Sequence, residues 1–296
     1  MSEKESGEPL IDCHAHFLHA GCGRTDWHDV NAARFRAGAR IGITCHVASV
    51  LGTFGFTSPT YFPSPADVSL GNDAMLELCE HQDVSSHTGG SSHRGDLEHP
   101  RVSVRMMVTV NPNHTTHSIA EIERCLARGG AHVVGVKLLA SRRADDPLLD
   151  PICALAAEHA LPVLHHIWQH RRREWPSQEI SDGADLALLA ARHPGVSFIL
   201  AHIGGGGDYL HTFHAVKESP NIYPDLSGSG VDRGMLDDAI KQLGPRRLLW
   251  GTDLTMETGL AKLRALDATG LLSADDLRDV RWRNAARIFP RAAFDC

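Results

Sequence analysis

The sequence has no long apolar stretch, because none of its hydrophobic runs approaches the roughly eighteen residues that a transmembrane helix needs. The first ten residues are polar and acidic, whereas a secretory signal is basic and then apolar. These two absences argue against a membrane protein and against an exported one. We therefore expect a cytoplasmic protein with no membrane partner.

Basic runs and paired cysteines are also scarce. The formal net charge is -7, and no run of Lys and Arg is long enough to follow a phosphate backbone, which argues against a nucleic-acid partner. The seven cysteines are odd in number and include no Cys-x-x-Cys motif, which fits reduced thiols rather than a disulfide framework. Five of them lie in apolar surroundings and are predicted to be buried, namely Cys13, Cys45, Cys79, Cys125 and Cys153.

Short apolar runs alternate with helical patterns along the whole chain. Strands are predicted over residues 10–17, 41–50, 102–110, 132–139, 161–167, 196–203, 221–226 and 247–251. Helices are predicted over residues 26–39, 70–81, 118–128, 148–159, 185–192, 233–242, 259–266 and 274–288. Eight strands alternating with helices are typical of a (β/α)₈ TIM barrel, an α/β fold of about 250 residues. Because the chain has no repeat or long linker, we expect one such domain over residues 1–296.

Histidine is abundant, with 20 copies, and several of these stand where predicted strands end. His14 and His16 end the first strand, where alternation places both on one face and within reach of a single metal ion. The histidine pair 165–166, His202 and Asp253 stand at the ends of three later strand segments. Because the carboxyl ends of barrel strands converge on one mouth, these side chains are predicted to share a site.

With these motifs in register, the chain resembles the amidohydrolase superfamily. The specific resemblance is to the amidohydrolase-related (amidohydrolase 2) branch, which includes metal-dependent hydrolases and the aminocarboxymuconate semialdehyde decarboxylases. It covers nearly the whole chain, through IDCHAH at residues 11–16, GVKL at 135–138, LPV at 161–163, AHIGG at 201–205, WGTD at 250–253 and NAARIF at 284–289. The match is specific for the family and uninformative about the substrate.

The resemblance implies a metal site with named roles. His14, His16, His166 and Asp253 are implied as ligands of one divalent metal ion, most simply Zn²⁺, with one position left open for water. When bound, such a metal lowers the pKa of water towards about 7 and so supplies a nucleophile. Asp253 is implied as ligand and proton acceptor, and His202 as general base or electrophilic helper. His165 is expected to point away, towards the helices or a carboxylate.

Four further residues are candidates for substrate contact. Lys137 lies inside an apolar strand, so its ammonium must reach the mouth or a carboxylate. Other superfamily branches carboxylate the matching lysine to bridge two metals, and a purely structural role is the third alternative. His46 either lines the pocket or belongs to the core. Trp168 is a candidate pocket wall, and Arg171 belongs to a basic loop that either selects an anionic substrate or is solvated surface.

Three functions follow from these residues. The main expectation is a metal-dependent hydrolase that attacks an amide, ester or lactone of a small, carboxylated molecule through activated water. The alternative is a lyase, a non-oxidative decarboxylase or hydratase, that uses the same metal to stabilise an enolate-like intermediate. A barrel that only binds would have lost a ligand or the base, and all five positions are present. The sequence is compatible with a homo-oligomer.

Overall fold

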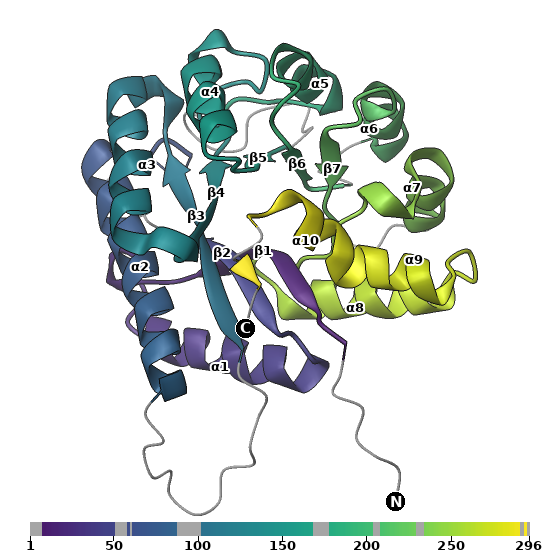
Figure 1. The fold of residues 1–296 in the computed structure, drawn as a ribbon, viewed down its shortest axis with the longest axis horizontal. Helices are drawn as coiled ribbons and strands as arrows, with labels where there is room; N and C mark the ends of the chain where they lie inside the picture. The colour runs from purple at the N-terminus through teal and green to yellow at the C-terminus, as the bar shows by residue number, and fades with distance from the viewer. Residues whose placement is uncertain are drawn as a thin grey trace, which may run out of the picture.

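The structure is a computed structural model that describes residues 8–50, 58–59, 61–87, 102–167, 178–203, 208–228, 234–290 and 293–294. A single parallel sheet of seven strands, in the order β1-β2-β3-β4-β5-β6-β7, curls around itself (Figure 1). The strands are β1 (Ile11–Phe17), β2 (Cys45–Val50), β3 (Ser103–Val110), β4 (Val133–Leu138), β5 (Val163–His166), β6 (Phe198–Ala201) and β7 (Ile222–Pro224). Each strand pairs with the next one along the chain, so every crossover returns over one face of the sheet.

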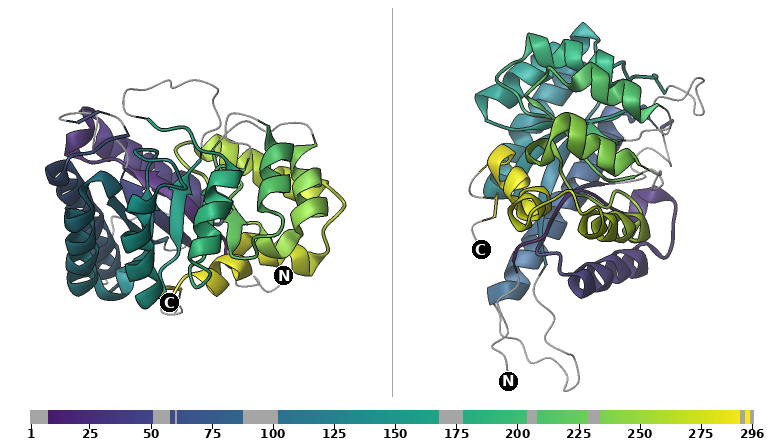
Figure 2. Two further views of the ribbon diagram at one scale, coloured as in Figure 1. Left: turned by 90° about the horizontal axis from the view of Figure 1, so that it is seen from above. Right: turned by 90° about the vertical axis from the view of Figure 1, so that its right-hand side faces the viewer.

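Helices cover the outer face of the curled sheet (Figures 1 and 2). They are α1 (Trp27–Ile41), α2 (Pro65–His87), α3 (Thr115–Gly129), α4 (Asp150–Glu158), α5 (Gly183–Arg192), α6 (Tyr209–Val216), α7 (Met235–Leu243) and α8 (Met256–Ala268). Helix α9 (Ala274–Arg278), a π-helical turn (Asp279–Arg283) and α10 (Asn284–Ile288) follow. The protein is thus an α/β fold built on a parallel sheet, and most predicted elements lie within a few residues of those observed.

The last predicted strand, 247–251, differs from the structure. A short 3₁₀ turn occupies Pro245–Arg247, and only isolated bridges follow, at Leu249 and Asp253. These still join the two edges of the sheet, because Leu226 N donates to Leu249 O at 2.8 Å and Cys13 N donates to Trp250 O at 3.0 Å. The backbone of Asp253 is left-handed (φ 54°), which ends any regular ladder there. The segment between Leu249 and Asp253 therefore lies between β7 and β1 without forming a regular strand.

Helix α6 was absent from the prediction. Its first turn is capped by Asp208, whose side chain accepts a hydrogen bond from His211 N at 3.1 Å. Phe213 and Val216 are buried against the core. The glycine run that precedes the helix and its short length of 8 residues weaken the periodic signal. With α6 in place, a helix follows each of the strands from β1 to β7.

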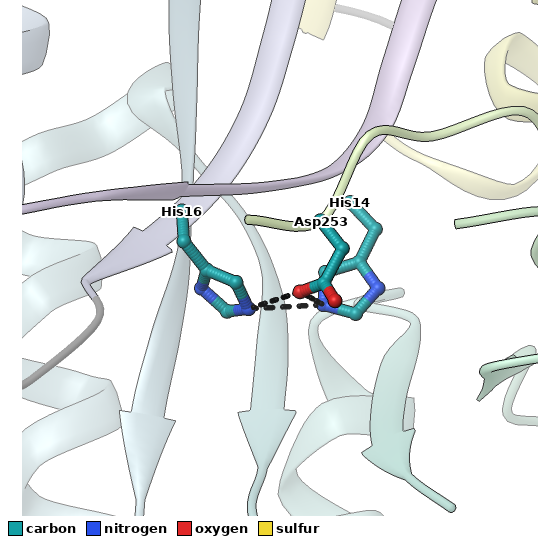
Figure 3. Close-up of side chains that lie close together, drawn as sticks. All are labelled: His14, His16 and Asp253. Carbon is teal, nitrogen blue, oxygen red and sulfur yellow. Dashed lines mark hydrogen bonds and ion pairs between the residues drawn. The ribbon is translucent and has the colours of Figure 1, made fainter. Parts of the chain in front are cut away.

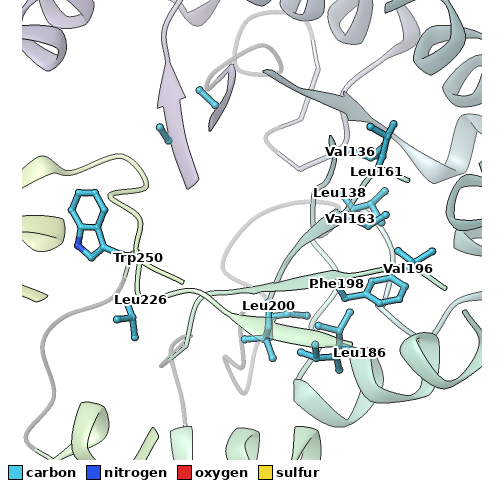
Figure 4. Packing of buried hydrophobic residues seen from close by; sticks show 14 of the residues in the cluster. Val136, Leu138, Leu161, Val163, Leu186, Val196, Phe198, Leu200, Leu226 and Trp250 are labelled. Carbon is cyan, nitrogen blue, oxygen red and sulfur yellow. The ribbon is translucent and has the colours of Figure 1, made fainter. Parts of the chain in front are cut away.

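The hydrophobic core has two parts, one on each face of the sheet. The outer part fills the space between strands and helices, where Leu186, Phe198 and Leu200 pack together (Figure 4). The inner part lies within the curl and includes Cys13 and Leu164. It also includes Ala285 and Ile288 of α10 together with Ile11, the first residue of β1. Helix α10 therefore covers the ends where the strands begin and leaves their carboxyl ends for a site.

Two expectations about composition can be compared with this fold. All five cysteines that were predicted to be buried are buried, namely Cys13, Cys45, Cys79, Cys125 and Cys153. Within the part of the chain that the structure describes, none of the helices has the length and apolar character needed to cross a membrane.

Candidate metal centre

Strand β1 brings two imidazoles to one point. Its pairing with β2 shifts register between Asp12 and Ala15, just where the strand reaches its polar end. His14 and His16 are both buried, and their Nε2 atoms lie 3.2 Å apart. Two neutral imidazole nitrogens this close can both coordinate one metal ion when each presents its lone pair.

Asp253 completes a group of three donors from the far end of the chain (Figure 3). Its Oδ1 lies 3.1 Å from His16 Nε2 and 3.8 Å from His14 Nε2. The backbone N of Asp253 donates to His14 O at 2.6 Å, so β1 itself positions the carboxylate. The three ligand atoms all lie within 4.8 Å of one another, a spacing that suits one metal ion.

His202 and His166 extend this group from β6 and β5. The His202 ring stacks on that of His14 at a centroid distance of 5.2 Å, and its Nε2 lies 3.7 Å from Asp253 Oδ2. The His166 ring meets that of His202 edge to face, again at 5.2 Å. The structure thus brings together the five residues that the resemblance implied as ligands and base. His166 contacts His202 and belongs to neither of the two groups whose ligand atoms lie within 4.8 Å of one another, which are His14, His16 and Asp253, and His14, His202 and Asp225.

Lys137 of β4 lies in the same group and is buried. Its Nζ is 2.9 Å from His14 Nε2. Burial lowers the pKa of Lys137 to about 8, although the charges of Asp253 and Asp225 oppose that shift. We call His14, His16, Lys137, His166, His202 and Asp253 the inner cluster.

Burial and neighbouring charges set the protonation states of the ligand candidates in the inner cluster. Burial lowers the pKa of His14, His16 and His166 below the ordinary value, so these rings are neutral at pH 7. Burial would raise the pKa of Asp253, but the neighbouring His202 and His16 outweigh it and hold that pKa well below its usual range. Neutral imidazoles and an ionised carboxylate are the protonation states that metal binding requires.

His46 does not join the inner cluster, which corrects its prediction as a pocket residue. Its Nδ1 lies 2.7 Å from Asp12 Oδ2, and its ring packs edge to face against Phe17 at 5.6 Å. A Cβ at Gly38 of α1 would lie only 2.9 Å from His46 Nε2, so the ring sits directly against that helix. Its strand neighbour Val47 faces into the curl, and alternation therefore turns His46 outwards.

Asp12 and His46 belong to a second polar group on the outer face, which we call the outer cluster and which also contains Arg34 and Thr252. Asp12 accepts from Thr252 N at 2.9 Å and from Thr252 Oγ1 at 2.6 Å. Arg34 of α1 hydrogen-bonds Thr252 Oγ1 and donates to Asp253 O at 2.7 Å. The outer cluster therefore holds the backbone from which Asp253 reaches the inner cluster.

Of three other residues considered in the sequence, only His165 can be placed. His165 is buried on the face opposite to His166, and its Nδ1 lies 2.9 Å from His166 O. Burial lowers the pKa of His165 to about 4. Trp168 and Arg171 lie outside the described residues.

No role was predicted for Asp225 and Ser227, which follow β7. Asp225 Oδ2 lies 2.8 Å from His14 Nδ1, and Ser227 Oγ lies 3.0 Å from His202 Nδ1. Both residues are fully buried. The signal that singled out Asp253, an acidic residue at the end of a predicted strand, was also present at Asp225 in the strand predicted over 221–226.

The fold and the inner cluster together define a class of protein, an α/β protein with a candidate metal site at the carboxyl ends of a curled parallel sheet. A comparison with family models is more specific, since the Amidohydrolase model matches residues 11–291. The chain belongs to the Amidohydrolase family, and the resemblance inferred from its motifs is confirmed. A comparison with curated proteins finds no match.

Solved structures of similar fold include two kinds of decarboxylase. A 5-carboxyvanillate decarboxylase from Sphingomonas paucimobilis is 17% identical with a TM-score of 0.65, over 96% of this chain and 99% of the other. A 2,6-dihydroxybenzoate decarboxylase from Rhizobium is 16% identical with a TM-score of 0.66, over 95% and 98%. A 5-carboxyvanillate decarboxylase from Novosphingobium aromaticivorans, complexed with manganese and a nitrobenzoic acid, is 16% identical with a TM-score of 0.64, over 95% and 96%.

Proposed function

We propose that the protein is a metal-dependent lyase that removes the carboxylate group of a small carboxylic acid as CO₂, without a redox step. The observation that carries this proposal is the position of Lys137. Its ammonium is buried and hydrogen-bonds His14 Nε2, the atom that a metal would take. Once the metal has taken that lone pair, the buried cation needs another partner, and a substrate carboxylate supplies one.

The donor set fits a divalent metal. His14, His16 and Asp253 offer two nitrogens and one oxygen within one coordination sphere, and we propose His166 as a further ligand on the basis of the family resemblance. When bound, the metal would supply positive charge that stabilises the electron pair released as the carbon–carbon bond breaks. Zn²⁺ is the expectation from the sequence, and the manganese in the Novosphingobium enzyme makes Mn²⁺ the other ion to test.

The residues of the chain then have distinct tasks. Lys137 pairs with the negative charge of the substrate, which is the anionic small molecule expected from the sequence. When the carboxylate leaves as CO₂, its bonding electrons stay on carbon, and that carbon must take up a proton. We assign the proton transfer to His202, whose Nε2 faces the carboxylate of Asp253 at 3.7 Å: this nitrogen accepts a proton from solvent and then donates it to the carbon.

Similarity in fold supports the lyase over the hydrolase that was our main expectation. The decarboxylases named above match nearly their whole lengths, although their identities of 16–17% bear on the fold alone.

We also propose that the segment between Leu249 and Asp253 closes the sheet as the eighth member of a (β/α)₈ barrel, in one domain over residues 1–296. Trp168 and Arg171 remain predicted substrate contacts.

Hydrolysis is the second candidate function, and a specific contact favours it. Asp253 faces His16 with one carboxylate oxygen at 3.1 Å and His202 with the other at 3.7 Å. A carboxylate in this position can accept a proton from water and pass it to His202, as an acyl-transfer reaction requires. The same residues would then act on an amide, ester or lactone.

A substrate screen separates the two reactions. The metal-loaded protein is given hydroxylated aromatic acids in one series, and lactones and N-acyl amino acids in the other. We expect CO₂ release from an acid of the first series, with no CO₂ from a His16→Ala variant. Cleavage of a lactone or amide, with no CO₂ from any acid, would instead establish the hydrolase.

A further inference from the structure

The backbone just after β7 places a carboxylate and a hydroxyl behind the inner cluster. Asp225 Oδ1 accepts from Ser227 N at 2.8 Å and also from the Ser227 hydroxyl. Asp225 Oδ2 lies 2.8 Å from His14 Nδ1, and Ser227 Oγ lies 2.9 Å from His14 Nδ1 and 3.0 Å from His202 Nδ1. The two residues therefore contact the rings of a metal-ligand candidate and of the proposed base from the side away from Asp253.

The protons in these contacts can be assigned from what each atom is able to do. A carboxylate only accepts, so His14 must carry its proton on Nδ1 in order to donate to Asp225. Ser227 has one proton and gives it to Asp225, so its oxygen accepts from His202, which must also be protonated on Nδ1. His14 then presents its Nε2 lone pair towards His16 Nε2, 3.2 Å away. His202 presents its Nε2 lone pair towards Asp253 Oδ2, 3.7 Å away.

The surrounding structure holds this pair in place. Gly228 has a left-handed backbone (φ 55°), and a Cβ there would collide with the ring of His202, so the ring lies directly on the turn. Lys262 of α8, which is buried, donates from Nζ to Ser227 O at 3.1 Å and to Gly228 O at 2.7 Å. The turn that carries Ser227 is thus fixed both by the ring it supports and by a neighbouring helix.

We infer that Asp225 and Ser227 are positioning residues that hold His14 and His202 as Nδ1–H tautomers, so that one side-chain pair sets the direction of a metal ligand and of the general base. This inference rests on the proposed function for the roles of the two histidines. It concerns contacts behind the rings, and its consequence is measurable without substrate. Outer partners of this kind typically contribute 10-fold to 100-fold to metal affinity.

The test combines imidazole nitrogen NMR on histidine-labelled protein with Zn²⁺ titration. In the unaltered protein, His14 and His202 should both be protonated at Nδ1. In Asp225→Asn, the Nδ1–H preference of His14 should weaken, because only the Ser227 oxygen, 2.9 Å away, remains as an anchored acceptor, and Zn²⁺ should bind about 10-fold to 100-fold more weakly. The matched control is Asp150→Asn, because Asp150 also pairs with a histidine, His193, at 2.7 Å, outside the inner cluster. It should leave both readouts unchanged.

A milder pair of variants keeps the inference testable if Asp225→Asn does not fold. Ser227→Ala should give His202 a mixture of tautomers while His14 stays protonated at Nδ1, and Ser227→Thr should restore the single tautomer. Unchanged tautomers in both Asp225→Asn and Ser227→Ala, or in Ser227→Ala alone if the other is unfolded, would overturn the inference. A protein that shows the expected tautomers and binds Zn²⁺ but releases no CO₂ contradicts only the proposed function.

Discussion

The inner and outer clusters use opposite faces of β1, and both contain histidine and aspartate side chains. In the outer cluster, each short contact joins a donor to an acceptor, as between His46 and Asp12 at 2.7 Å. In the inner cluster, His14 Nε2 faces the Nε2 of His16 at 3.2 Å and the ammonium of Lys137 at 2.9 Å. The outer cluster thus pairs donors with acceptors, except at the buried His46 Nε2 and Arg34 Nε, which have no hydrogen-bond partner among the described residues. The inner cluster instead gathers several lone pairs at one point, where a cation would satisfy them together.

The partners behind each ring explain this difference. The Nδ1 atom of His14 is taken by Asp225, and that of His16 lies 3.1 Å from Ser49 Oγ, so each ring presents Nε2 to the centre. The Nδ1 atom of His46 is likewise held by Asp12, but its Nε2 faces α1 and Phe35 packs nearby. A histidine on a strand is therefore a metal-ligand candidate only when the nitrogen that has no other partner lies close to further donor atoms. The following predictions test this distinction.

The largest effect is expected from removal of an inner-cluster ligand. His16→Ala and Asp253→Ala should each lose bound metal and abolish CO₂ release, because either change leaves too few donors for tight binding. Metal content per chain and turnover are the measurements. His159→Ala, which removes an exposed histidine, is the matched control and should change neither. Full metal retention in both ligand variants would show that the inner cluster does not bind the metal, and would contradict the distinction between the clusters.

His202→Asn should separate chemistry from metal binding. The variant should keep most of its metal while turnover falls by about 10² to 10⁴, the usual contribution of a general acid–base group. Steady-state kinetics and metal analysis on the same sample provide the two values. If the metal leaves together with the activity, His202 is a ligand and the assigned roles are wrong.

Metal removal should lower stability through the inner cluster alone. A ligand present at 100 times its Kd stabilises the folded state by about 2.7 kcal/mol, so chelation should lower the melting temperature of the unaltered protein. Because Asp253→Ala lacks the site, its melting temperature should not respond to chelator. Equal responses in the two proteins would indicate that the stabilising metal binds elsewhere.

His46→Gln should have the smallest functional effect, since it alters only the outer cluster. The loss of the buried contact with Asp12 should cost about 1–3 kcal/mol of unfolding free energy, measured by chemical denaturation. Metal content should stay the same, and turnover per metal-bound chain should stay within about threefold, because one tenfold step corresponds to 1.36 kcal/mol of barrier. Loss of metal from a folded His46→Gln protein would show that His46 contributes to the metal site.

The sequence predicted the alternating fold because apolar, β-branched runs mark buried parallel strands clearly. It did not predict α6, whose 8 residues follow a glycine run. It predicted a strand over 247–251, where the structure has only isolated bridges beside the left-handed backbone of Asp253. Strand ends also indicated where His14, His16, His202 and Asp253 would meet. Local patterns were sufficient wherever the strand end itself defines the position.

Two parts of the site depend on features that local patterns do not contain. Both faces of a parallel strand under helices are apolar, so the residues around His46 did not reveal that it points outwards. The contacts of Asp225 with His14 join residues 211 positions apart and depend on how the first and last parts of the sheet meet. Such pairings require the tertiary structure.

The stoichiometry of bound metal, measured in the unaltered protein and in Lys137→Ala, tests the central claim most directly. One inner cluster with Lys137 as a substrate contact predicts about one divalent ion per chain in both proteins, with CO₂ release impaired only in the variant. Two ions in the unaltered protein and one in Lys137→Ala would show that the lysine bridges two metals. No metal in either protein would contradict the account of the inner cluster.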